Sequence, residues 1–348
     1  MATGAWPNLY DVSSRLDPKG DIPTIAEMLS QHNDWRKDMP MKEANGFTFH
    51  EEVFRTSIPA GSWRQYNQGV PYGKSTTAKF RVGMAMLADW SQVDRSLARH
   101  SGNEAKFRES EDVAFLEGMS QTVTETFCYG NTVINPAQFM GWMPFYNTVN
   151  TANAQNAVNV IDGGGTGSSN ASIIMAGWGE ETIFGLFPRG SKAGLNWEDQ
   201  GTVVPGFDSL GNRFPAYTSY FEEEIGLCPK DWRWGGRIAN LDTTTASGGL
   251  ASTNPPDLFA LIRKLLMNLP AGGATTAIMD TDAPHGDPSV MVVLYMNRTT
   301  RYWTDIQAIR NRNVLLPPDQ SAGRAWTEFD GKPIKVIDQL VNNETRVT

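Results

Sequence analysis

Two strand-forming segments joined by a long aromatic connection constrain the fold of this chain more than any other feature. Residues 47–58 are rich in Phe, Val, Thr and Ile, and residues 76–87 place apolar side chains at every second position. The sixteen residues 59–74 are too many for a tight turn. Their large aromatic side chains are Trp63, Tyr66 and Tyr72. The pattern predicts a long β-hairpin whose tip is too aromatic for a loop that meets only solvent.

Helical periodicity begins near residue 104. Apolar residues recur there at steps of three and four until Gly130, which predicts a long amphipathic helix. A second helix is predicted after Asp257, a good N-cap residue, and it should end at Pro270. A third helix should follow Asn297, another candidate cap. One face of this third helix would carry Tyr302, Ile306 and Ile309.

Apolar segments predict strands in the remaining chain. The strand-forming segments are residues 172–178, 182–187, 290–295 and 334–337, with strands and packed loops expected in 201–241. The Gly/Ser stretch 163–169 is predicted to be a flexible break. The Pro-rich segment before the hairpin should be an extended arm with one small helix at residues 24–33. The fold class expected from this order is α+β.

Charge and composition exclude dedicated nucleic-acid-binding proteins and membrane-spanning proteins. Asp and Glu number 38 against 30 Lys and Arg, so the net charge is -8 and no basic excess exists to bind phosphates. No apolar run approaches the roughly 18–20 residues that cross a bilayer, and we expect no membrane partner. Cys128 and Cys228 are far apart in apolar surroundings and are predicted to be buried thiols.

No sequence motif for catalysis or cofactor binding is found. The Gly-rich stretch lacks the Lys-Ser/Thr pair of a phosphate loop, and no two His residues have the spacing of a zinc helix. We therefore expect no catalytic residue, cofactor or metal site. Acidic clusters such as Glu222-Glu223-Glu224, together with 11 Trp residues, leave one alternative. That alternative is a β-rich carbohydrate-active or carbohydrate-binding protein.

The order of these elements resembles the Hong Kong 97-type fold of the major capsid proteins of tailed double-stranded DNA bacteriophages. Short segments look like one family of these proteins, namely Trp6–Val12, Asn131–Pro136, Gly190–Leu195, Tyr295–Arg298 and Asn342–Thr345. The resemblance spans nearly the whole chain. It implies a shell-building protein without enzymatic activity, which self-assembles into the hexamers and pentamers of an icosahedral head around the genome.

The resemblance also implies a division of the chain. The parts are an N-terminal arm at residues 1–45, an extended β-hairpin loop at 46–89, a peripheral domain with a spine helix at 90–130, an axial domain with interleaved peripheral-domain strands at 131–316, and a closing strand at 317–348. The extended loop would lie over a neighbouring subunit. Covalent cross-linking occurs in part of the family, but no motif in this sequence nominates a pair.

Partners and location follow from the same resemblance. Besides other copies of the chain, it implies a portal protein, a decoration protein, and packaged double-stranded DNA held without sequence-specific binding. Some members carry a long, charged scaffolding segment before the arm, and this sequence shows none, so we expect a separate scaffolding protein. Assembly is expected in the host cytoplasm, and the final location is the capsid of the virion.

The hairpin tip is the predicted contact between subunits. Aromatic residues and Arg are enriched where interfaces gain most of their binding energy. The sequence therefore predicts four subunit-interface residues, Trp63, Arg64, Tyr66 and Tyr72.

Overall fold

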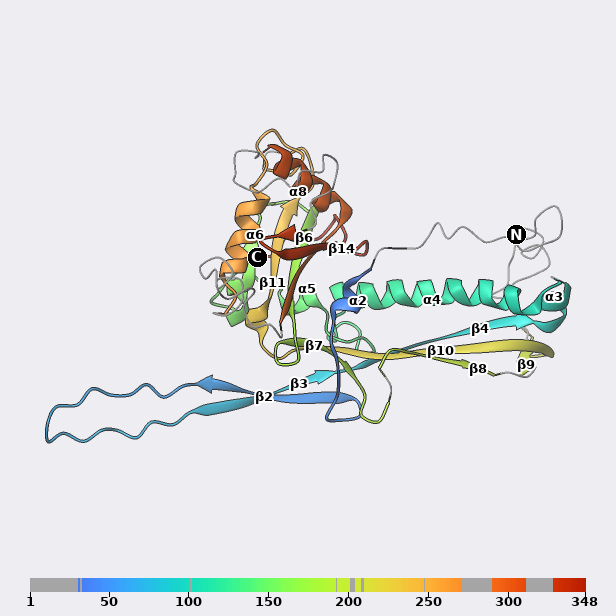
Figure 1. The fold of residues 1–348 in the computed structure, drawn as a ribbon, viewed down its shortest axis with the longest axis horizontal. Coiled ribbons are helices and arrows are strands. Elements are labelled where there is room, and N and C mark those ends of the chain that lie inside the picture. Colours follow the sequence, from blue (N-terminus) through green and yellow to red (C-terminus); the bar gives the residue numbers. More distant parts are fainter. Residues whose placement is uncertain are drawn as a thin grey trace.

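The structure is a computed structural model, and it describes residues 31, 33–100, 102–191, 193–200, 204–207, 210–246, 248–270, 290–310 and 328–348. Figure 1 shows a central body from which two long parts extend in opposite directions. One is the hairpin of β2 (Phe49–Ser57) and β3 (Thr76–Gly83). The other is called the arm below and is distinct from the N-terminal arm expected at residues 1–45. It consists of α3 (Arg95–His100), α4 (Glu104–Tyr129), β4 (Ala85–Asp94), β8 (Leu195–Asp199), β9 (Val204–Phe207) and most of β10 (Arg213–Pro229). The Trp6–Val12 segment and most of the helix predicted at 24–33 lie outside the described residues.

A mixed sheet forms the centre of the body. All nine residues of its strand β6 (Asn170–Trp178) are buried, which explains the continuous apolar run in the sequence. Antiparallel neighbours flank it on both sides, β11 (Gly235–Asp242) and β12 (Met291–Met296). The sheet continues in parallel through β5 (Val160–Asp162) beside β11 and β14 (Lys332–Val336) beside β12, and β13 (Glu328–Phe329) closes it against β14.

Helices and turns complete the body. In α6 (Leu258–Met267) one apolar face is buried, with Leu258, Ile262, Leu265 and Leu266. The Asp257 carboxylate accepts hydrogen bonds from the amides of Phe259 and Ala260, as predicted for an N-cap. Asn297 likewise caps α8 (Arg298–Arg310) by accepting from the Thr300 amide at 2.8 Å. The shorter elements are α2 (Trp35–Asp38), β1 (Met41–Glu43), α5 (Trp142–Phe145), and 3-10 turns at Gln155–Asn159 and Trp232–Trp234.

The 17-residue strand β10 joins the arm to the body. Residues 216–225 pair with β4 in the arm, and residues 226–229 pair with β7 (Ile183–Phe187) in the body. Helix α4 packs on this arm sheet and is about 39 Å long at 1.5 Å per residue. One continuous strand therefore fixes the direction in which the arm leaves the body.

Two expectations about strands and loops were wrong. The strand predicted at residues 76–87 is two strands, because the chain leaves β2 after Gly83 and from Ala85 pairs with β10 instead. The Gly/Ser stretch is not a flexible break at its start, since the Gly163 and Gly165 amides donate to carbonyls of β11 at 2.8 and 2.7 Å. A Cβ atom at either glycine would overlap neighbouring atoms, so these glycines permit close packing.

The buried face of α8 also differs from the expectation. Thr300, Thr304 and Gln307 are buried, whereas Tyr302 is 56% exposed. The Gln307 side chain accepts from the Leu258 amide and donates to the Pro256 carbonyl, at 2.9 and 2.8 Å. The hydrogen bonds of Gln307 to the start of α6 therefore determine which face of α8 is buried. Apolar periodicity alone does not reveal this face.

Candidate subunit interface

The hairpin is a two-stranded ribbon that leaves the body. Its strands pair antiparallel from Phe49↔Gly83 to Ser57↔Thr76. Neither outer edge of the ribbon pairs with another strand among the described residues. An isolated two-stranded hairpin is marginally stable in water, and open strand edges are sites for pairing with another chain. The ribbon therefore has the geometry of an element that another molecule completes.

All four predicted interface residues lie at the hairpin tip. Trp63 and Tyr72 are each 105% exposed and Tyr66 is 98% exposed. The Arg64 guanidinium donates to the Gln68 carbonyl at 3.3 Å and is otherwise open to solvent. Large aromatic side chains that are fully exposed on one element indicate a contact surface. No described side chain of the same chain covers them.

The base of the hairpin, by contrast, is fixed to the body. Val82 is buried in a small apolar cluster with Phe184 of β7 and Cys228 of β10. The His50 ring is buried, contacts the Phe184 ring edge-on at 5.9 Å, and its Nε2 lies 3.0 Å from a Glu52 carboxylate oxygen. His50 and Val82 are buried at the base, whereas residues 53–74 are exposed. The body therefore contacts only the base of the hairpin.

The hairpin is also basic in an acidic protein. Between residues 53 and 88 the sequence has five basic residues and no Asp or Glu. Arg81 pairs with Glu51 at 2.5 Å and stacks over the Phe49 ring. The other four form no salt bridge with Asp or Glu among the described residues, and they are Arg55, Arg64, Lys74 and Lys79. The Lys79 charge nevertheless acts on the Glu51 carboxylate.

Helix α2 connects the arm helix, the arm sheet and the body. The Trp35 ring stacks on Phe127 of α4 at 4.0 Å, and its Nε1 donates to Thr124 at 3.0 Å. Arg36 forms an ion pair with the buried Glu223 of β10. A third residue, Asp38, accepts from Tyr295 of β12 at 2.7 Å and pairs with Lys335 of β14 at 2.5 Å.

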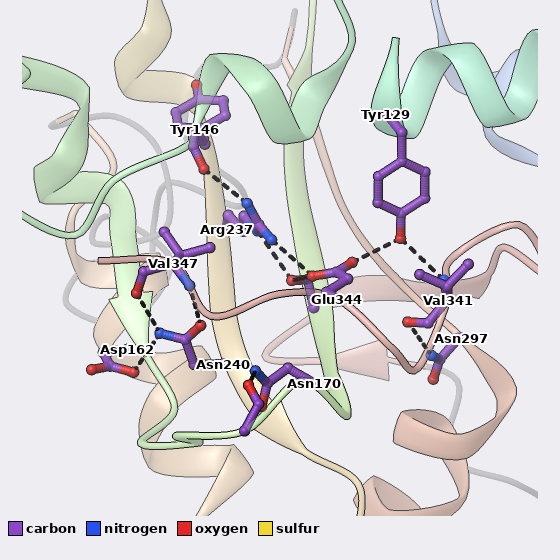
Figure 2. Close-up of polar contacts among 12 residues, drawn as sticks. Tyr129, Tyr146, Asp162, Asn170, Arg237, Asn240, Asn297, Val341, Glu344 and Val347 are labelled. Carbon is purple, nitrogen blue, oxygen red and sulfur yellow. Dashed lines mark hydrogen bonds and ion pairs between the residues drawn. The ribbon is translucent and has the colours of Figure 1, made fainter. Parts of the chain in front are cut away.

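A buried polar network joins the C-terminal segment to the end of α4 (Figure 2). The Glu344 carboxylate pairs with the Arg237 guanidinium at 2.8 Å, accepts from Ser172, and accepts from the Tyr129 hydroxyl at 2.7 Å. The side chains of Arg237 and Glu344 are each 5% exposed. Burial and the nearby Glu344 charge raise the pKa of Tyr129, so its hydroxyl stays a donor.

The last residues of the chain are likewise part of the body. The Asn240 side chain donates to the Val347 carbonyl at 2.9 Å and accepts from the Val347 amide at 2.8 Å, as Figure 2 shows. Thr148 donates to the Thr348 carbonyl at 2.8 Å. Sequence reasoning missed Arg237, Glu344 and α2, because their partners lie far away in the sequence and no local pattern marks them.

The described residues offer no support for a catalytic centre. No group of His, Cys, Asp and Glu within them could hold a metal ion, and no helix among them is long and apolar enough to span a bilayer. Cys128 and Cys228 are buried free thiols, as predicted, and burial raises the pKa of Cys228 to about 12. Within the acidic cluster 222–224, Glu223 is buried against Arg36 and its two neighbours lie on the opposite face of β10.

The chain matches known proteins along its length. Residues 17–348 match the family model of major capsid protein GP7. A chain in the near-atomic structure of bacteriophage Epsilon15 is 31% identical, with 100% of both chains covered and a TM-score of 0.74. A chain of the bacteriophage JBD30 capsid is 11% identical over 91% of this chain and 95% of that chain, with a TM-score of 0.48. No protein with a curated description matches.

The family model and the Epsilon15 chain confirm the Hong Kong 97-like α+β fold expected from the sequence, and they give no support to a carbohydrate-active or carbohydrate-binding protein. The matched proteins are structural components of phage capsids rather than enzymes. The chain belongs to the major capsid protein GP7 family and is a major capsid protein of a tailed phage.

Proposed function

We propose that the hairpin is the extended loop by which each subunit binds a neighbour within hexamers and pentamers. Its main contact residues would be Trp63, Arg64, Tyr66 and Tyr72. The observation that carries the proposal is the full exposure of three large aromatic side chains at the end of a ribbon with two open edges. Burial of such side chains against a neighbour would supply much of the association energy, since aromatic anchors dominate interfaces.

The division of the chain belongs to the same proposal. Residues 46–89 would form the extended loop, 90–130 the peripheral part with α4 as its spine, 131–316 the axial part, and 317–348 the closing strand. The pairing of β10 with β4 supports strands of the axial range interleaved with the peripheral part. The network of Glu344 supports a C-terminal segment that closes the body.

Further partners complete the proposed role. A separate scaffolding protein would guide assembly in the host cytoplasm, and a portal protein and a decoration protein would join the shell. The net charge of -8 suits a container whose wall does not bind the phosphates of packaged double-stranded DNA tightly.

Replacing Trp63, Tyr66 and Tyr72 with Ala tests the role of the tip. We expect shell yield, measured by electron microscopy and sedimentation, to fall by at least about tenfold, as loss of several interface anchors implies. The control is Leu210→Ala, an exposed apolar residue outside the hairpin. Shells of normal yield and thermal stability from the triple variant would overturn the proposal.

A further inference from the structure

A cavity lies where the hairpin joins the body. Its volume is about 160 Å³, and residues 80–83 at the end of β3 line it from the hairpin side. On the body side, its lining includes Trp142 and Phe145 of α5 and Leu227 of β10. The walls of the cavity therefore belong to two parts of the subunit, the base of the hairpin and the body.

The aromatic residues of the body wall already have partners for their polar atoms. Trp142 Nε1 donates to the Gly236 carbonyl at 3.1 Å, and the Tyr146 hydroxyl, also in the lining, donates to the Trp232 carbonyl at 2.7 Å. Burial raises the pKa of Tyr146, so its hydroxyl stays protonated and keeps this bond. These residues therefore offer their rings, rather than free hydrogen-bonding groups, to a molecule in the cavity.

The charge in the lining is also neutralised. Arg81 is the charged residue among the described residues that line the cavity, and its guanidinium pairs with Glu51 and stacks over the Phe49 ring. Thr132 adds one half-buried hydroxyl. A charged ligand would lose its hydration here without gaining an unpaired opposite charge, and its binding is therefore disfavoured.

The size of the cavity narrows the class of ligand further. Apolar cavities of about 150 Å³ stay dry and bind benzene. The atoms that line such a space lack contact partners on one side, so a ligand of matching size gains dispersion contacts as well as burial of its own apolar surface. A single six-membered ring fits this volume.

We propose that the cavity at the base of the hairpin is a binding site for a small uncharged aromatic or aliphatic molecule of about the size of one benzene ring. The ligand would contact Phe80 and Val82 of the hairpin together with Trp142 and Leu227 of the body. Its binding would therefore hold the base of the hairpin against the body. This site goes beyond the proposed contacts of the hairpin tip and does not depend on them.

Binding of benzene and of its charged analogue benzoate tests the class of ligand. We expect benzene to bind the full-length chain with a Kd on the order of 1 mM, measured by saturation-transfer NMR on free subunits and on shells. Benzoate should bind at least about tenfold more weakly, because burial of its carboxylate is not compensated. Equal affinities for the two molecules would overturn the proposal.

A variant that fills the cavity tests its location. Thr132→Phe adds a ring to the lining and should weaken benzene binding at least about tenfold, since little free volume remains. The matched control is Thr151→Phe, at an exposed position outside the lining, which should bind benzene as the unaltered chain does. Unchanged binding by a folded Thr132→Phe subunit would place the benzene elsewhere and overturn the site.

Two measurements on the unaltered chain avoid variants that fail to fold. Nuclear Overhauser contacts should join benzene protons to the rings of Phe80 and Trp142. Benzene at about ten times its Kd should slow hydrogen exchange of amides 80–83 by about tenfold if these amides exchange when the base leaves the body, and should leave amides 63–72 unchanged.

The remaining outcomes are equally decisive. Contacts of benzene with other residues only, or unchanged exchange at residues 80–83, would overturn the proposal. Binding to free subunits that is lost in shells would assign the cavity to a contact with a second copy and would also overturn it. None of these results bears on the tip residues, whose alanine variant tests the role of the hairpin separately.

Discussion

In the body, all nine residues of β6 are buried, whereas every residue from 53 to 74 of the hairpin is exposed. The body strand is paired on both sides and covered on both faces, so its conformation follows from contacts within one chain. The hairpin buries only its root, and its pairing alone is marginal in water. The contrast teaches that the two parts carry different tasks. Contacts within the body stabilise the subunit, whereas the hairpin leaves its apolar side chains exposed for contact with a neighbouring subunit.

The largest expected effect on stability lies in the buried network of the body. Glu344→Ala leaves Arg237 as a buried charge without its partner, and we expect the free energy of unfolding to fall by about 3–5 kcal/mol. Denaturant unfolding of the unassembled subunit measures this. The control is Glu328→Ala at an exposed strand position, for which a change within about 0.5 kcal/mol is expected. Equal, small losses for both variants would show that the C-terminal segment does not stabilise the body.

A smaller loss is expected at the start of α6. Asp257→Ala removes the acceptor for the Phe259 and Ala260 amides, and we expect a loss of about 1 kcal/mol. Asp257→Asn keeps an acceptor and should lose less, by the same unfolding measurement. A loss for Asn as large as for Ala would mean that the side-chain oxygen is not what stabilises this helix start.

The smallest effect on subunit stability is expected from the hairpin itself. Replacing residues 58–75 with Asn-Gly joins Ser57 to Thr76 through a two-residue turn and removes the exposed tip. The unfolding free energy should change by less than about 0.5 kcal/mol, because no described body contact is lost. Shell assembly should nevertheless fail. A strongly destabilised subunit would contradict the division of tasks between hairpin and body.

The sequence predicted elements that local chemistry defines. The long helix follows from apolar steps of three and four, and the start of α6 from Asp257. The break at Met84 was missed because it depends on pairing between β4 and β10, which lies more than 120 residues later in the chain. Gly163 and Gly165 were misjudged for the same reason, since β11 explains them. Arg237 and Glu344 are 107 residues apart, and no spacing rule connects them.

The same limit applies to the candidate interface. The tip residues could be nominated from composition, because three aromatic side chains in a Gly/Pro connection are unusual. The grouping of Trp90, Glu198 and Tyr220 on the arm sheet could not be predicted, since these residues become neighbours only through strand register. The basic character of the hairpin, by contrast, can be read from the sequence, because residues 53–88 contain no Asp or Glu.

Hydrogen exchange of unassembled subunits and of shells tests the division between body and hairpin most directly. Amides of β6 and β12 should be protected in both states, because their hydrogen bonds lie in the buried sheet of one chain. Amides of β2, β3 and the tip should exchange quickly in the free subunit and become protected in the shell. Equal exchange of the hairpin in both states would contradict its proposed role as the element that a neighbouring subunit covers.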